Sequence, residues 1–228
     1  MPITKVSIIV PAKKEEGTIL ECVTRILRVC PQAEILVVDS GLDQTRELIQ
    51  KLNHPQVRYI LSVPDRGKGD AIAQGIRESC GDVIVQIDSD LQFMPEDIPA
   101  LLEPIFNQTA DMVLGSRFHS HSKRKNQSSV RSFGNVIISL WASALIAQRV
   151  TDGMAGLKAW KKEVTQSFAL TSYHFSYEIE LFVKAIRKKW RVMEVPVATD
   201  ARRFGESKLP IFKTGFRVLR DTLLFRFF

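Results

Sequence analysis

The 228-residue sequence has few of the features that mark disulfide-rich, zinc-binding or membrane-spanning proteins. Its three cysteines (Cys22, Cys30 and Cys80) are odd in number and none lies in a Cys-x-x-Cys pair, which argues against a disulfide framework and a zinc site. The four histidines have no metal-ligand spacing. No apolar run reaches the roughly 20 residues of a membrane span, and no charged and apolar leader precedes the first strand-like run. We therefore expect a cytoplasmic protein without a secretory signal.

Acidic residues are outnumbered, with 25 Asp and Glu against 32 Lys and Arg and a net charge of +7. A basic protein is attracted to polyanions, so charge alone admits nucleic acid, an anionic membrane or a phosphorylated ligand as partner. The sequence has no strand motif in which aromatic and basic residues interleave, and we therefore expect no nucleic-acid partner. Hydrophobic residues make up 45% of the chain, which is enough for one sizeable core.

Short apolar runs alternate with helix-like segments through the first half of the chain. The expected strands cover residues 6–11, 34–39, 57–61, 83–88 and 111–115, and the expected helices cover 16–29, 45–52, 70–79 and 96–106. Strands that are apolar along their whole length suit a parallel sheet covered on both faces. The pattern therefore predicts an α/β fold with a Rossmann-like, mostly parallel sheet flanked by helices.

The second half of the chain has a different texture. A polar, basic stretch at 119–129 predicts a loop, and the strongly apolar residues 136–146 predict a buried or interfacial helix. An amphipathic helix at 177–188 and a strand at 192–197 follow. Basic and apolar residues alternate over 211–228, which predicts a basic amphipathic helix. We expect one domain over residues 1–210 and this tail after it.

Carboxylates follow three of the expected strands. Glu15 and Glu16 come after the first strand, Asp39 ends the second, and Asp88-Ser89-Asp90 ends the fourth. Ligands of open parallel sheets bind beyond the carboxyl ends of the strands. Two carboxylates in an i, i+2 pair are well placed to hold Mg²⁺ or Mn²⁺, which prefer oxygen ligands. Spacing alone leaves a solvated turn open as the alternative.

The segment from Val85 to Gln92 resembles the core motif of family-2 glycosyltransferases with the GT-A fold, and most of all that of the polyprenyl-phosphate (dolichyl-phosphate) mannose or glucose synthases. Other segments similar to that family follow its order: 8–16 (opening strand and P-x-x-N-E-E turn), 37–45 (acidic base motif), 67–71 (G-K-G-x-A), 114–117 (G-S-R), 194–197 (E-V-P) and 203–209 (R-x-G-x-S-K). The chain departs from the pattern at Lys14, where the family has Asn, and at Ser40, which replaces a second acid. Both departures lie in the expected base and ribose site, so the base of the donor stays open.

The resemblance implies inverting transfer of a hexose from GDP-mannose or UDP-glucose to a polyprenyl phosphate, with Mg²⁺ or Mn²⁺ as cofactor. The implied metal ligands are Asp88, Asp90 and Gln92. The implied donor-binding residues are Pro11, Ala12, Glu15, Asp39, Lys68, Gly69, Asp88, Ser89, Arg202 and Arg203. The implied catalytic residues are Asp90, Arg117, Arg131 and Lys208, of which Lys208 belongs to a cationic lid over the diphosphate.

Arg117 and Arg131 flank the polar stretch, and guanidinium groups bind phosphate in a bidentate manner. We expect both to bind the acceptor phosphate. A phosphate monoester has a second pKa of about 6 and is largely dianionic at neutral pH, so it attacks without a general base. If the acceptor is instead a soluble hydroxyl, a base helps the attack, and the candidates are Asp152 and Glu178.

A polyprenyl phosphate resides in a membrane, so the enzyme must reach the membrane surface. The positive charge, the apolar residues 136–146 and the basic tail predict peripheral attachment to the cytoplasmic face. Ordinary core packing, a homodimer contact or a membrane-anchoring partner are the alternatives for these segments. Two other functions stay open: a glycosyltransferase with a soluble hydroxyl acceptor, and a catalytically silent subunit that binds sugar nucleotides.

Overall fold

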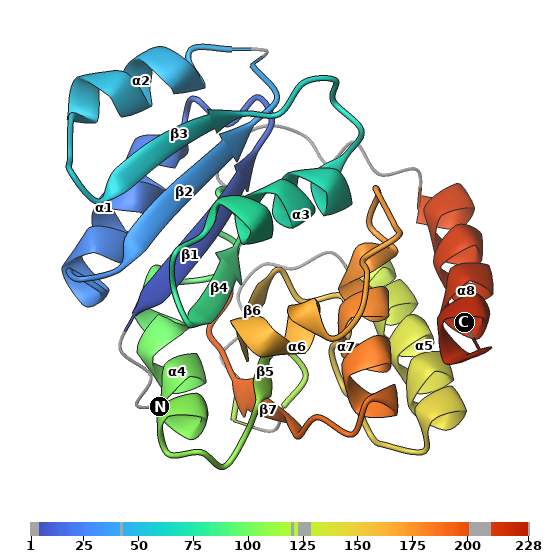
Figure 1. The fold of residues 1–228 in the computed structure, drawn as a ribbon. Helices are drawn as coiled ribbons and strands as arrows, with labels where there is room; N and C mark the ends of the chain where they lie inside the picture. The colour runs from blue at the N-terminus through green and yellow to red at the C-terminus, as the bar shows by residue number, and fades with distance from the viewer. Residues whose placement is uncertain (1–4, 42, 120, 123–128, 201–210, 228) are drawn as a thin grey trace.

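The computed structural model describes residues 5–41, 43–119, 121–122, 129–200 and 211–227. Within them, one seven-stranded sheet carries helices on both faces (Figure 1). The strands are β1 (Val6–Ala12), β2 (Glu34–Asp39), β3 (Val57–Leu61), β4 (Val83–Ile87), β5 (Met112–Ser116), β6 (Leu157–Lys161) and β7 (Val192–Pro196). The helices are α1 (Ile19–Val29), α2 (Thr45–Leu52), α3 (Lys68–Glu78), the 3-10 helix η1 (Pro95–Asp97), α4 (Ile98–Phe106), α5 (Ser129–Ile146), α6 (Lys162–Gln166), α7 (Tyr177–Arg187) and α8 (Ile211–Phe227).

The strand order is β3-β2-β1-β4-β6-β5-β7, and every neighbouring pair is parallel except those that involve β6. The predicted mostly parallel α/β sheet is thus confirmed. The sequence pattern did not predict β6, which runs antiparallel between β4 and β5. Its first four residues are all buried, but one of them is Lys158, a charged residue that breaks the apolar signal of a core strand.

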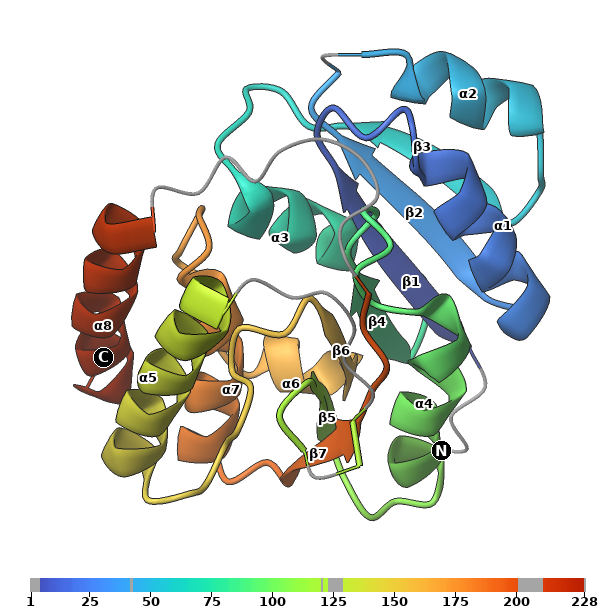
Figure 2. The same ribbon diagram turned by 180° about the vertical axis from the view of Figure 1, so that it is seen from behind.

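Helices α1, α2 and α4 lie on one side of the sheet and α3, α5, α6 and α7 on the other, where α8 packs outside α5 and α7 (Figures 1 and 2). Neighbouring residues of β1 serve opposite faces: Ile8 packs in the first core, and Ile9 packs with Ile72 of α3 in the second. Because successive side chains of a strand point to opposite faces, a strand that is covered on both faces must be apolar throughout. This is the reason for the continuous apolar runs in the sequence.

The predicted C-terminal helix is present as α8, and it lies beside α5 and α7 (Figure 1). Val218 and Phe225 are buried there, and Trp141 Nε1 of α5 donates a hydrogen bond to the carbonyl of Leu219 at 3.2 Å. Other apolar side chains of the pair stay exposed, among them Phe216 at 74%. No helix of the described part of the chain is both long and apolar enough to cross a membrane. Helix α5 begins at Ser129, earlier than the sequence predicts.

Candidate functional site

The Asp88-Ser89-Asp90 segment follows β4 directly, at the edge where the parallel strands β1 and β2 also end. Ser89 Oγ donates to the carbonyl oxygen of Pro11 at 3.1 Å, which ties the segment to the end of β1. Asp90 Oδ1 accepts a hydrogen bond from the backbone N–H of Gln92 at 3.1 Å, across a turn in which Leu91 has a φ of 58°. Asp90 is only 8% exposed, which is unusual for an aspartate in a solvated turn.

Lys68, at the start of α3, lies between two carboxylates. Its Nζ is 2.6 Å from Oδ1 of Asp88 and 2.8 Å from Oε1 of Glu178, which comes from α7. Glu178 also pairs with the fully buried Lys158 of β6 and accepts hydrogen bonds from Gln86 Nε2 at 3.0 and 3.2 Å. Four elements of the fold thus meet in one buried charge cluster.

The electrostatics of this cluster favour the charged forms of Glu178 and Lys68, whereas burial shifts the pKa values of Asp88 and Lys158 against theirs. Burial acts to raise the pKa of Glu178, but the ammonium groups of Lys158 and Lys68 outweigh it and lower that pKa to about 2. Burial also acts to lower the pKa of Lys68, and Asp88 and Glu178 overcome it and raise that pKa. Asp88 shows the opposite balance, because burial raises its pKa more than Lys68 lowers it, and nearby Asp90 adds to the rise.

The predicted metal ligands are Asp88, Asp90 and Gln92. In the described ranges, no three His, Cys, Asp or Glu side chains gather in a group that could hold a metal ion. Two carboxylates with the neighbouring Gln92 nevertheless fit Mg²⁺ or Mn²⁺, because these ions take oxygen ligands and commonly keep sites for water and substrate phosphate. The charge of Asp90 contributes to the raised pKa of Asp88.

Arg117, just beyond β5, is held by Asp152. Its Nε lies 2.7 Å from Oδ2 and its Nη2 lies 2.8 Å from Oδ1 of this fully buried carboxylate, and its guanidinium sits 5.2 Å from the ring centroid of Phe93. Asp88 and Glu178 also act on the pKa of Arg117, so the guanidinium belongs to the same group of charges. Among the described residues, none accepts a hydrogen bond from Nη1. One edge of Arg117 is therefore engaged in structure and the other faces away from Asp152.

Asp39, at the end of β2, is fully buried, and burial raises its pKa. Its Oδ2 accepts hydrogen bonds from the backbone N–H of Gly41 and from Tyr59 Oη, both at 2.9 Å. Its Oδ1 is buried and has no partner within the described part of the chain. Asp39 pairs in register with Ala12 of β1, so the expected base-site residues lie side by side. An orphan buried acceptor is costly, and a ligand N–H would satisfy it.

The loops that surround this site are connected. Glu15 is buried after β1, and its carboxylate accepts a hydrogen bond from Thr18 Oγ1 at 3.3 Å. The backbone N–H of Glu16 donates to Asp43 Oδ2 at 3.0 Å, which joins the loop after β1 to the loop after β2. Gly69 lies so close to the carbonyl of Ser172 that an added Cβ would overlap it, so this position accepts only glycine.

Several predicted site residues are not described. Arg202, Arg203 and Lys208 lie outside the described residues, and so does the side chain of Arg131, whose backbone falls in the first turn of α5. Their assigned roles stay predictions. The structure brings the remaining predicted residues to one edge of the sheet.

The residues that the sequence did not single out are the cluster's supports. Gln86 of β4, Tyr177 of α7 and Lys158 of β6 all contact Glu178, with Tyr177 Oη at 2.5 Å from Oε1. Gly156 precedes β6, and an added Cβ there would overlap Oδ2 of Asp88. The sequence could have indicated two of them, because Gln86 and Lys158 are polar residues at buried positions of otherwise apolar strands.

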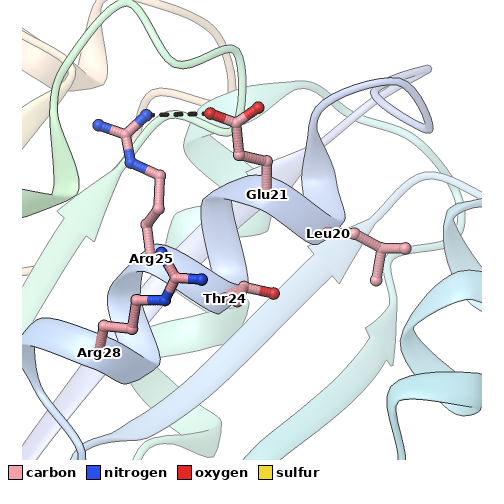
Figure 3. Close-up of a pocket in the computed structure, with 5 residues that line it drawn as sticks. All are labelled: Leu20, Glu21, Thr24, Arg25 and Arg28. Carbon is pink, nitrogen blue, oxygen red and sulfur yellow. Dashed lines mark hydrogen bonds and ion pairs between the residues drawn. The ribbon is translucent and has the colours of Figure 1, made fainter.

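A hollow on the outer side of α1 has a different character. It is lined by Leu20, Glu21, Thr24, Arg25 and Arg28, and an ion pair of 3.2 Å joins Glu21 to Arg25, one turn further along the helix (Figure 3). None of these residues belongs to the site at the strand ends.

Comparison with known proteins shows which family the chain resembles. The sequence model described as "Glycosyl transferase family 2" matches residues 7–182. A dolichol-phosphate mannosyltransferase of Pyrococcus furiosus is 35% identical over 95% of this chain, which spans 62% of that protein's length. An undecaprenyl-phosphate mannosyltransferase of Micrococcus luteus is 28% identical over 90% of this chain and 87% of its own.

Solved structures share the fold. Glucosyl-3-phosphoglycerate synthase from Mycobacterium tuberculosis, crystallised with Mn²⁺, UDP and glucosyl-3-phosphoglycerate, superposes with a TM-score of 0.73. The sequence identity is 25%, and the match covers 97% of this chain and 79% of that one. The predicted GT-A fold is therefore confirmed, and the chain belongs to glycosyl transferase family 2.

Proposed function

We propose that this protein transfers a hexose from a nucleotide sugar to a polyprenyl phosphate and inverts the anomeric carbon. The observation that carries the proposal is the buried carboxylate pair of Asp88 and Asp90 beside Lys68, at the strand ends of a family-2 glycosyltransferase fold. The names of the Pyrococcus and Micrococcus relatives support a polyprenyl phosphate acceptor. The Mn²⁺ and UDP bound by the mycobacterial synthase support a divalent cation and a nucleotide donor.

The donor half of the site follows from its polar groups. Asp39 Oδ1, buried and without a described partner, would accept an N–H of the nucleobase, and uracil and guanine both offer one. UDP-glucose and GDP-mannose are both compatible with this contact. Asp88, Asp90 and Gln92 would hold Mg²⁺ or Mn²⁺, which supplies Lewis-acid stabilisation of the departing diphosphate. Lys68 would add a second positive charge on the same leaving group.

The acceptor half favours a nucleophile that needs no base. Both candidate bases are buried and form ion pairs. Asp152 binds Arg117 in a bidentate manner, and Glu178 pairs with Lys158 and Lys68. With a pKa of about 2, Glu178 is a poor proton acceptor at neutral pH. A dianionic phosphate attacks without help, and attack opposite the leaving group inverts the sugar carbon. Arg117 and Arg131 are the residues that we assign to this phosphate.

Attachment to a membrane surface is part of the proposal. Exposed apolar side chains follow one another on α5 and α8: Phe133, Ile137, Leu140, Trp141, Phe216, Leu223, Leu224 and Phe227. Within the described side chains of α8, three arginines accompany them and the one acidic residue, Asp221, is paired with Arg220 at 2.7 Å. An apolar face with basic residues suits shallow insertion at the cytoplasmic, anionic face of a bilayer. A second copy or an anchoring partner chain is the alternative occupant of this face.

Transfer assays test the chemistry directly. The purified chain is incubated with Mn²⁺ and either GDP-mannose or UDP-glucose, and the acceptor is a short polyprenyl phosphate, the matching polyprenol, or a soluble glycoside with a free hydroxyl. We expect product only with the polyprenyl phosphate acceptor and with only one of the two donors. NMR of the product should show an inverted anomeric configuration. Equal transfer to a hydroxyl acceptor would contradict the proposal.

A thermal-shift panel distinguishes an active transferase from a catalytically silent subunit that binds sugar nucleotides. A ligand that binds only the native state raises Tm in proportion to RT ln(1 + [L]/Kd). The panel uses GDP- and UDP-sugars with and without Mn²⁺. A donor that raises Tm but gives no transfer to any acceptor would favour the silent subunit.

The assignment of Arg131 has its own kinetic test. Arg131→Ala should raise the KM for the acceptor far more than the KM for the donor, because the lost contact is with the acceptor phosphate. An equal rise in both KM values would argue against acceptor-phosphate binding.

A further inference from the structure

Lys68 contacts one of the expected metal ligands, Asp88, and also the buried Glu178. Its ammonium group lies within 2.8 Å of two carboxylates, Asp88 and Glu178, which are 27% and 2% exposed. A buried ammonium group needs an opposite charge beside it, and Lys68 has two. Any cation that competes for Asp88 therefore changes what Lys68 can contact.

The backbone that carries Lys68 is fixed from the outside. Gly69 and Asp70 both donate their N–H groups to the carbonyl of Tyr173, at 2.8 and 3.3 Å, which occupies the first free donors of α3. The loop that bears Tyr173 is itself held by buried Glu180, which accepts hydrogen bonds from the N–H groups of Thr171 and Ser172. These hydrogen bonds fix the backbone beside Lys68, so a change of partner requires only a rotation of its side chain.

Glu178 is the fixed end of the arrangement. Lys158, Gln86 and Tyr177, which are all fully buried, hold its carboxylate in place. Asp88 is the open end, because it is more exposed and lies next to Asp90 in the expected metal site. An ammonium and a divalent cation on the same carboxylate repel each other, so they cannot share Asp88 at full strength.

We infer that the ammonium group of Lys68, held by Glu178, pairs with Asp88 before the donor binds. When a divalent cation binds Asp88, the ammonium group moves to the diphosphate of the donor. The inference rests on the proposed function, since it presumes a metal and a diphosphate at this edge. Glu178 is then a positioning residue: it keeps the ammonium group within reach of both places. Asp88 thus faces a positive charge in both states: Lys68 before the exchange and the divalent cation after it.

The test uses Mn²⁺ alone and then nucleoside diphosphates. Mn²⁺ binding to the full chain is measured by calorimetry, and UDP and GDP binding is measured at saturating Mn²⁺. Lys68→Met should lower the Kd for Mn²⁺ by roughly tenfold, because the competing charge is gone, and raise the Kd for the nucleotide by roughly tenfold. A purely structural lysine would weaken both ligands together.

A matched control and an opposite variant sharpen the test. Lys161→Met removes an ion pair of similar exposure, with Asp111 at 2.7 Å at the other end of the sheet, and should leave both affinities unchanged. Glu178→Gln with Lys158→Met removes a buried pair as a neutral unit, which cores commonly tolerate. This double variant leaves Asp88 as the sole carboxylate of Lys68, so Mn²⁺ should bind severalfold more weakly.

Unchanged or weaker Mn²⁺ binding in Lys68→Met would overturn the inference. A wild-type chain that binds no Mn²⁺, with or without nucleotide, would overturn both the inference and the metal assignment. Opposite shifts of Mn²⁺ and nucleotide affinity without any sugar transfer would support the cation exchange and overturn the transferase assignment instead.

Discussion

Two charge clusters lie at opposite ends of the same sheet and differ in composition. At the amino end of β5, one carboxylate, Asp111, takes two cations: Lys161 at 2.7 Å and Arg191 at 2.8 and 2.9 Å. At the carboxyl end of β4, Asp88 has one cation, Lys68, which it shares with Glu178, and Glu178 has Lys158 as a second partner. The hydrogen bonds of Arg191 hold the pKa of Asp111 well below its usual range, whereas burial raises the pKa of Asp88. A carboxylate with surplus partners stabilises the fold, and one that shares its partner is prepared for a ligand.

The largest effect should come from removing a carboxylate at the carboxyl end. Asp90→Ala should lower kcat by about 10³-fold or more, because the diphosphate loses its metal-mediated stabilisation. Sugar transfer is measured together with Mn²⁺ binding, and circular dichroism checks the fold. Asp90→Asn is the matched control for shape: it keeps an acceptor for the Gln92 N–H and should be as inactive. Near-normal activity in either variant would sink the metal assignment.

A glycine-to-alanine substitution at each end of the sheet allows the two ends to be compared directly. Gly156→Ala places a Cβ against Oδ2 of Asp88 and should lower kcat by about 10²-fold through displacement of that carboxylate. Gly81→Ala, at the amino end, places a Cβ 2.6 Å from the backbone N of Ser7 and should cost about 1–3 kcal/mol of unfolding free energy. Urea unfolding and transfer assays are run on both proteins. If Gly156→Ala loses only stability, the distinction between the ends fails there.

Asp111→Asn should lower the unfolding free energy by about 1–2 kcal/mol at pH 7 and leave activity nearly unchanged. The folded-state pKa of Asp111 is depressed, so its contribution is fully present above the unfolded value near 3.8 and is lost as pH falls towards the folded value. The gap between wild type and variant should therefore be constant from pH 7 to pH 5 and shrink on further acidification. Urea unfolding across this range measures it, and a gap that widens in acid would refute the assignment.

The smallest change in stability should come from the α5–α8 face, which belongs to neither cluster. Phe227→Ser, at a side chain that is 64% exposed, should change the unfolding free energy by less than about 0.5 kcal/mol and weaken partition into anionic liposomes severalfold. Phe225→Ala, two residues earlier and 7% exposed, is the contrast and should cost about 3 kcal/mol. Unchanged liposome partition in Phe227→Ser would assign the exposed face to a protein contact.

Local patterns predicted most of the fold. The alternation of apolar runs and helix-like segments located β1 to β5 and α1 to α4 to within a few residues, because parallel strands covered on both faces are apolar throughout. β6 escaped prediction because its inward Lys158 makes sense only beside Glu178, 20 residues later. Helix α5 began earlier than expected, since its first turns are polar and basic.

The sequence by itself determined which acids stand at the strand ends, because Asp39, Asp88 and Asp90 follow apolar strands and their order matches a known family. Only the tertiary structure decided their partners. Lys68 meets Asp88 and Glu178 through contacts that span 20 and 110 residues of sequence, and Arg117 is engaged by Asp152. Hydropathy acts locally and is written into each segment, whereas a buried charge takes its role from whichever opposite charge the packing of distant elements brings within about 3 Å.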